Sequence, residues 1–358
     1  MILSRTETLP VVSCHNEWDP LEEVIVGVVE GACVPTWNPA LAATMPEEHH
    51  AFFAEQGGKP FPAQLIAAAS RELEELVHVL EGEGVTVRRP EPVDFSRPFA
   101  TPDWQSASGL YAAMPRDLLL VIGDEIIEAP MAWRCRYHEI DSYRSLLCDY
   151  FRLGARWSAA PRPLLRDELY DPDWQRPRAA GQSYVVGESE PTFDAADFVR
   201  CGRDLFVQRS HVTNELGITW LERHLGDGYR IHRLAPRDRH PMHIDASFMP
   251  LAPGKLLINP ERIASVPKMF RSWKVLEAPR PAHPSSFLMC SPWVSMNVLM
   301  LDERRMIVER DDADFMRAAR RWGFEPIPVG FRNFNQFGGA FHCATLDVRR
   351  RGELQSYF

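Results

Sequence analysis

The sequence has no long apolar run and no excess of positive charge, and each absence excludes a class of protein. The longest purely apolar stretches, such as residues 118–122, fall far short of the roughly 18 residues that a membrane span needs. The formal net charge is -9, and the short arginine run at residues 349–351 does not offset it. We therefore expect neither a membrane nor a nucleic acid as partner.

Paired cysteines are also missing. The seven cysteines are an odd number, lie far apart and include no C-x-x-C pair. This pattern is typical of reduced thiols and offers no zinc-type spacing, so we expect no metal and no cofactor. The first ten residues lack the apolar core of a secretory signal. We expect a cytoplasmic protein in which residues 1–11 are flexible.

The chain carries a repeating order of secondary structure and no Gly/Ser-rich linker, which favours a single domain over residues 1–358. Apolar spacing and glycine stops predict the order strand, strand, helix, strand four times. These four units cover residues 117–159, 192–234, 243–278 and 294–329. A first unit, over residues 21–89, has the helix and the last strand but only one leading strand.

The two ends of the chain complement each other in this pattern. The first unit lacks a leading strand, and the strand that follows Cys343 has no helix after it. Pairing these two ends would complete a fifth unit and close a ring without exposed edges. The sequence therefore predicts an α/β fold of five strand-strand-helix-strand modules in a closed ring.

Cys343 is the candidate nucleophile. It follows the pair Gly338-Gly339, which lets the backbone turn tightly and lets a ligand approach closely. We expect an extended segment in which Cys343 and Asp347 share one face. A buried cysteine can also be an inert packing residue. Cys290 is the rival nucleophile, but it sits on a proline-flanked loop, and we interpret it as a lining residue.

Acidic residues open several of the predicted units. His243 and Asp245 begin the fourth, where an extended backbone would place both side chains on one side, and Asp194 and Asp117 open the third and second. Such aspartates can be mere turn formers. In a ring, however, all three would face one centre, where paired carboxylates could hold a planar guanidinium. That cation would lower the pKa of Cys343.

Seven segments of the chain closely resemble the L-arginine amidinotransferases, above all glycine amidinotransferase, and also the inosamine-phosphate amidinotransferases of aminoglycoside pathways. The segments are residues 16–27, 84–90, 114–117, 125–134, 193–198, 241–245 and 338–343. The resemblance extends from about residue 12 to residue 358. It implies the pentein fold, a five-bladed α/β propeller, in agreement with the repeat.

The resemblance also implies roles for single residues. Cys343 would carry the amidino group, His243 would act as acid and base, and Asp194 would orient His243. The residues that match the family's substrate contacts are Asp117 and Asp245 for the guanidinium, Arg262 for the arginine carboxylate, and Ser291 and Tyr111 for further contacts.

Two positions depart from the glycine enzyme. This chain has His240 and Cys290 where that enzyme has asparagine and serine. Together with Met242, these residues are expected to help choose the acceptor.

The predicted reaction is a ping-pong transfer of the amidino group from L-arginine to an acceptor amine, with release of L-ornithine. Glycine is the favoured acceptor, ahead of a larger lysine-like or aminocyclitol amine. An arginine deiminase-like hydrolase would use the same cysteine, histidine and aspartates with water. A protein that binds arginine without catalysis is the other alternative. A homodimer is the candidate assembly.

Overall fold

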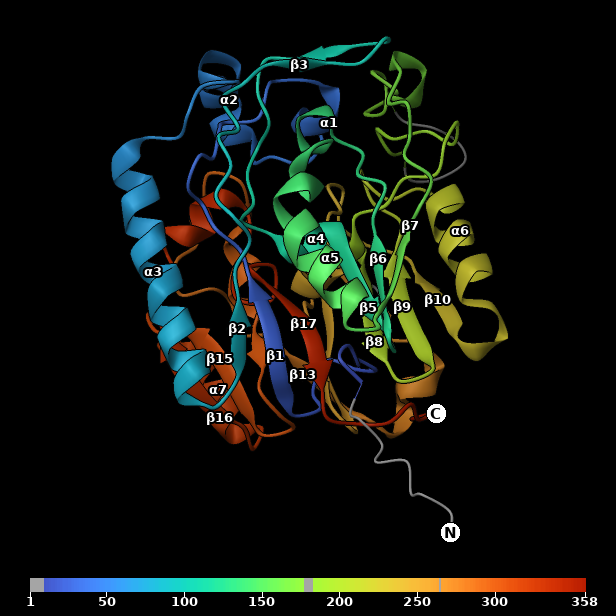
Figure 1. Ribbon diagram of the computed structural model, residues 1–358. Helices are drawn as coiled ribbons and strands as arrows, with labels where there is room; N and C mark the ends of the chain where they lie inside the picture. The colour runs from blue at the N-terminus through green and yellow to red at the C-terminus, as the bar shows by residue number, and fades with distance from the viewer. Residues whose placement is uncertain (1–9, 177–182, 264) are drawn as a thin grey trace.

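The computed structural model describes residues 10–176, 183–263 and 265–358. Most of the predicted flexible N-terminus, residues 1–9, lies outside this range. Five three-stranded sheets form the centre of the described part, with α3, α5 and α6 on the outside (Figure 1). No helix in these ranges is both long and apolar enough to cross a membrane.

All five sheets share one topology. The first two strands pair antiparallel and the third runs parallel to the second, as the repeat predicts. Four sheets are contiguous in the sequence. Their strands are β5 (Leu119–Ile122), β6 (Glu125–Glu128) and β7 (Arg156–Ala159); β8 (Phe198–Cys201), β9 (Asp204–Gln208) and β10 (Arg230–Leu234); β11 (Phe248–Ala252), β12 (Lys255–Ile258) and β13 (Lys274–Glu277); β14 (Leu299–Met300), β15 (Arg305–Glu309) and β16 (Glu325–Val329).

The fifth sheet joins the two ends of the chain, as predicted. β17 (Thr345–Arg350) pairs antiparallel with β1 (Leu21–Val26), and β2 (Thr86–Arg88) lies parallel to β1 on its other side. In Figure 1 the blue β1 and the red β17 lie side by side. Strand pairing in the described residues stays within each sheet and does not merge the five into a closed sheet. The propeller ring therefore stays a prediction.

A helix connects the second and third strands of each sheet. α3 buries Leu73, Leu76 and Leu80 in the same core as the β1 residue Val24. The connecting helices are α3 (Ala63–Gly82), η3 (Glu139–Tyr143) continued by α5 (Arg144–Arg152), α6 (Glu215–Leu225), the single 3-10 turn η8 (Lys268–Ser272) and α7 (Ala313–Arg321). The loop after β1 adds α1 (Pro39–Ala42), η1 (Glu47–His49) and α2 (His50–Gln56).

The leading strands start later than predicted. Each is preceded by one tight turn, in which backbone N–H groups bond within the turn. The turns are α4 (Pro115–Leu118), η5 (Ala195–Asp197), η7 (Ile244–Ala246), η9 (Pro292–Met296) and residues 341–344 before β17. Asp117, Asp194, Asp245 and Cys343 therefore lie in or beside these turns and not in strands. The extended backbone predicted at His243 is wrong, because its φ is +57°.

Candidate active site

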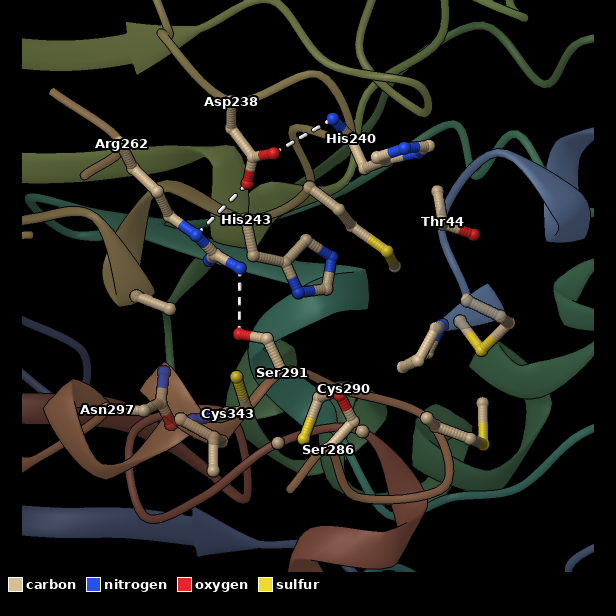
Figure 2. Close-up of a pocket in the computed structure, with 18 of the residues that line it drawn as sticks. Thr44, Asp238, His240, His243, Arg262, Ser286, Cys290, Ser291, Asn297 and Cys343 are labelled. Atoms are coloured by element: carbon tan, nitrogen blue, oxygen red, sulfur yellow. Dashed lines mark hydrogen bonds and ion pairs between the residues drawn. The ribbon is translucent and has the colours of Figure 1, made fainter. Parts of the chain in front are cut away.

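Three of the turns before the leading strands, η7, η9 and residues 341–344, line a pocket of about 380 Å³, whereas α4 and η5 do not (Figure 2). Of the eleven site residues predicted from the sequence, eight line it. They are Cys343, His243, Asp245, Arg262, Ser291, Cys290, Met242 and His240. Asp117 and Asp194 lie behind His243, while Tyr111 lies deeper. The segment 44–48 and Asn297 also line the pocket and were not predicted.

Cys343 is held by its glycine pair and by Asn297. Gly338 adopts φ +103°, a conformation that glycine tolerates best. A Cβ on Gly339 would lie 2.5 Å from the Cβ of Cys343, so only glycine fits there. The backbone N–H of Cys343 donates to Oδ1 of Asn297 at 2.9 Å, and its Sγ lies 3.5 Å from Oδ2 of Asp245.

The thiol of Cys343 is neutral at neutral pH. Burial raises its pKa well above the ordinary value of a cysteine, and the carboxylates of Asp245 and Asp117 raise it further. A ligand cation between those carboxylates would offset their charge and lower the thiol pKa. The site is therefore arranged to form a thiolate when a cation is bound.

His243 lies between two aspartates. Its Nε2 is 3.0 Å from Oδ2 of Asp194, and its Nδ1 is 3.6 Å from Oδ1 of Asp117. Burial alone would lower the pKa of the imidazole, but the two carboxylates raise it to about 10. At neutral pH His243 is thus an imidazolium that can donate a proton inside the pocket.

Arg136 fixes the two aspartates from behind, and sequence reasoning missed it. Its Nη1 lies 2.8 Å from Oδ2 of Asp117 and 3.4 Å from Oδ2 of Asp194, and its Nε donates to Glu139 at 2.8 Å. The guanidinium stacks 5.5 Å from the ring centre of Tyr111. Tyr111 thus packs on Arg136 outside the pocket lining, and its predicted substrate contact stays a prediction. Only the proximity of Arg136 to the segment 125–134 could have singled it out.

Asp245 is anchored by a second histidine that was not predicted. Its Oδ2 lies 2.7 Å from Nδ1 of His342, whose Nε2 is 3.2 Å from Oε2 of Glu17. Burial would raise the pKa of Asp245, yet His342 brings it below its ordinary value. Glu17 in turn forms paired bonds with Arg200 at 2.6 and 2.8 Å. Asp245 is thus tied to a buried ionic network of His342, Glu17 and Arg200.

Arg262 lies at the outer part of the pocket. Its Nη2 donates to Oγ of Ser291 at 2.7 Å, and its Nε lies 3.0 Å from Oδ2 of Asp238 (Figure 2). Cys290 contacts the carbonyl of Asn335 at 3.3 Å, and burial raises the pKa of its thiol to about 12. Cys290 lines the pocket, and its role there stays a prediction.

His240 does not point at the reacting thiol. Its Nδ1 lies 2.9 Å from the carbonyl of Ala43, and its ring packs 5.6 Å from the ring of Trp174. In Figure 2 the ring extends toward Thr44. His240 therefore fastens the loop after β1 to the pocket wall, and it is neither in solvent nor beside Cys343.

Three buried carboxylate oxygens in this site have no hydrogen-bond partner among the described residues. One is Oδ1 of Asp194, and the other two, Oδ1 of Asp117 and Oδ1 of Asp245, belong to the aspartates that lie near Cys343. The 3.6 Å approach of His243 to Asp117 is an ion pair and too long for a hydrogen bond. A buried acceptor without a partner is costly, so the oxygens of Asp117 and Asp245 are suited to N–H donors of a bound cation.

Asp117, His243 and Cys343 are the described residues that could also hold a metal ion, since their ligand atoms lie within 4.8 Å of one another. A metal needs the neutral imidazole and the thiolate. Here the carboxylates keep His243 protonated, and burial keeps the thiol neutral. This arrangement suits proton transfer better than metal binding.

Comparison with known proteins decides the family. No family model matches the chain. It is 55% identical over 354 residues to the L-arginine:L-lysine amidinotransferase of Pseudomonas savastanoi pv. phaseolicola, which covers 98% of this chain and 97% of that protein. The chain belongs to the amidinotransferase family. This amidinotransferase is also 50% identical over 358 residues to the mitochondrial glycine amidinotransferase of Danio rerio, covering 97% of the chain and 85% of the relative.

Solved structures of amidinotransferases also match this chain. SxtG, an amidinotransferase from Microseira wollei in the saxitoxin biosynthetic pathway, matches with a TM-score of 0.91 and 54% identity over 97% of this chain and 99% of its own. The inosamine-phosphate amidinotransferase StrB1 of Streptomyces griseus matches with a TM-score of 0.88 and 38% sequence identity, over 97% of this chain and 99% of its own. A dimethylarginine dimethylaminohydrolase at 14% identity and a TM-score of 0.58, covering 91% of this amidinotransferase and 99% of its own chain, shares the fold alone.

Proposed function

We propose that this amidinotransferase moves the amidino group of L-arginine to an acceptor amine through an amidino-cysteine on Cys343, with release of L-ornithine. The observation that carries the proposal is the pair of unpartnered oxygens on Asp117 and Asp245 beside the thiol of Cys343. They offer two acceptors to a guanidinium and would place its central carbon next to sulfur. The name of one relative, the L-arginine:L-lysine amidinotransferase, contains the same donor.

In the donor half-reaction, the guanidinium lowers the pKa of the Cys343 thiol and its proton leaves to solvent. The thiolate attacks the central carbon, and the bond from that carbon to the side-chain nitrogen of ornithine breaks. His243 gives its proton to this nitrogen and becomes neutral. Asp194 holds the imidazole in place for the transfer. A positively charged amidino group then remains on sulfur.

In the acceptor half-reaction, an amine enters the space that ornithine leaves. The neutral His243 takes the amine proton as its nitrogen attacks the amidino carbon. The carbon–sulfur bond breaks, and the thiolate of Cys343 is reprotonated from solvent after the guanidino product leaves. Protons and charge balance over the two steps without a metal or a redox partner.

The acceptor is proposed to be an amino acid. Arg262 and Ser291 form a cationic and hydroxyl pair suited to a carboxylate, and the same pair can serve donor and acceptor in turn. Glycine and lysine are the two candidates, and each is named in a relative that matches nearly the whole chain. Glycine keeps its place as the leading acceptor.

The wider architecture is part of the proposal. We propose that the five sheets are the blades of one propeller domain and that the protein acts in the cytoplasm. Pairing of β1 with β17 supports closure, because it joins the first and the last strand of the chain in one sheet. The seven free cysteines support a reducing compartment.

The test is incubation with arginine alone, an acid quench and mapping of the adduct by mass spectrometry. We expect an amidino group on Cys343, none in Cys343→Ser, and an unchanged adduct in the matched variant Cys290→Ser. Ornithine without an adduct, or an adduct on Cys290, would contradict the assignment. Citrulline formed without an added amine would support the hydrolase, and bound arginine without product would support a mere binding protein. Addition of glycine, lysine and larger amines in turn then identifies the acceptor.

A further inference from the structure

Asn297 occupies a position in its module that matches two residues of the reaction centre. It lies two residues before β14, as Asp117 lies two before β5 and Cys343 two before β17. Its side chain is buried and lines the pocket. In Figure 2 it lies beside Cys343. The fifth module thus contributes an amide where the second and first contribute a carboxylate and a thiol.

The orientation of this amide is set by its oxygen. Oδ1 accepts from the backbone N–H of Cys343 at 2.9 Å and of Ala340 at 3.2 Å. Because two donors face the same atom, that atom must be the oxygen. Nδ2 is therefore fixed on the opposite side, and it is buried with no hydrogen-bond partner in the part of the chain that the structure describes. A buried amide donor without a partner is energetically costly. We therefore expect a reacting group to supply the missing hydrogen-bond acceptor during catalysis.

We propose that Asn297 is a further catalytic residue, whose Nδ2–H donates to the sulfur of Cys343 whenever that sulfur is negatively charged. This inference rests on the proposed function. The charge is present twice, before the attack on the guanidinium carbon and when the acceptor amine expels the thiolate. The amide proton stays on nitrogen throughout, so no bond to it forms or breaks.

A neutral donor suits this site better than a cation would. Burial and Asp245 raise the pKa of the Cys343 thiol, and a donor that faced the sulfur would act in the opposite direction. A lysine or arginine in its place would also stabilise the thiolate. It would, however, repel the guanidinium that the carboxylates are there to hold. The amide stabilises the sulfur anion without competing with the substrate.

The variant Asn297→Asp distinguishes the role of the amide oxygen from that of the amide nitrogen. It keeps an oxygen acceptor for both backbone N–H groups and loses the N–H donor. The variant Asn297→Ala loses the acceptor and the donor without adding a charge. The readout is alkylation of Cys343 by iodoacetamide between pH 7 and 10 in the whole protein without arginine, with the site mapped by mass spectrometry. We expect both variants to react about tenfold more slowly at pH 8, and the rise of the rate with pH to move to higher pH.

Asn259→Asp is the matched control. Asn259 is equally buried, its Oδ1 accepts from the N–H of Glu261 at 2.9 Å, and its Nδ2 also lacks a partner, but it does not line the pocket. Its alkylation profile should equal that of the wild type.

Slowing in Asn297→Asp alone would mean that added charge is responsible, and slowing in Asn297→Ala alone would mean that only the backbone clamp matters. Either result overturns the proposal, as does an unchanged rate in both. If Asn297→Asp does not fold, the pH dependence of the Asn297→Ala rate decides: a rise displaced to higher pH supports the lost donor, whereas an equal slowing at every pH means that only the backbone clamp matters and overturns the proposal. Because alkylation needs neither arginine nor an acceptor, this result is independent of failure of the proposed function.

Discussion

Nε2 of His243 lies 3.0 Å from Oδ2 of Asp194, on the side of the imidazole away from the Nδ1 that faces Asp117. The pKa of His243, about 10, is above its ordinary value of 6.5. The imidazolium therefore stabilises the folded state fully below about pH 6.5, and this stabilisation declines as pH rises and is lost above about pH 10. The same charge makes His243 a proton donor over the whole physiological range.

Asp194→Asn should move the alkaline limit of ornithine release to lower pH, because it removes a charge that holds the proton on His243. We expect single-turnover rates at pH 8 to fall by about 10²- to 10⁴-fold. Rapid-quench measurements from pH 6 to 10 would show the shift. Asp204→Asn is the matched control, since Asp204 is as buried and lies 2.7 Å from His232 outside the pocket. An equal pH profile in both variants would contradict the role of Asp194.

Arg262→Ala should raise the KM for arginine by about 10- to 100-fold with little change in kcat, since a charge-assisted pair with the α-carboxylate contributes about 1.5 to 3 kcal/mol. Steady-state kinetics with arginine and with agmatine, which lacks that carboxylate, check this. The exposed Arg271→Ala serves as control. Equal use of agmatine and arginine by the wild type would refute the contact.

His240→Asn should change kcat/KM among acceptor amines by about 2- to 10-fold and leave single-turnover ornithine release unchanged. The reason is indirect: loss of the 2.9 Å contact to the carbonyl of Ala43 loosens the loop that walls the pocket. Substitution of the exposed His78 on α3, His78→Asn, is a suitable control. If both half-reactions change equally, position 240 does not select the acceptor.

Gly339→Ala should destabilise the protein by about 1 to 3 kcal/mol and abolish alkylation of Cys343 in the native state, because the new Cβ overlaps the Cys343 side chain and lies 3.0 Å from Sδ of Met114. Urea unfolding and mass mapping measure the two effects. Gly82→Ala has open space around it at the end of α3 and should be neutral or stabilising. Normal alkylation of Gly339→Ala would show that the turn can relax.

The sequence predicted the module order well because each module repeats the same apolar spacing and glycine stops. The antiparallel partner of β1 was found for the same reason, since a missing strand and a surplus strand are visible in the pattern. The turns before the leading strands were missed: an aspartate at a strand start and one in a preceding turn look alike in sequence. His243 shows the consequence, because its positive φ turns its side chain away from the direction that an extended backbone predicts.

The supporting residues could not be predicted, because they come together only through the tertiary fold. Arg136 and His342 have no spacing that relates them to Asp117 or Asp245, although each lies within 2.8 Å of one of them. Asn297 carries no sequence signal either, since its role depends on an amide whose oxygen is already occupied by the neighbouring turn.

The pairing of β1 with β17 also determines when the enzyme can first exist during its synthesis. β1 emerges from the ribosome early but cannot gain its antiparallel partner until almost the whole chain has been made, which takes roughly 15 to 60 s at ordinary elongation rates. Cys343 emerges immediately before that partner strand. The nascent chain thus lacks Cys343 while its first module is open, and the proposed nucleophile arrives together with the strand that completes the sheet.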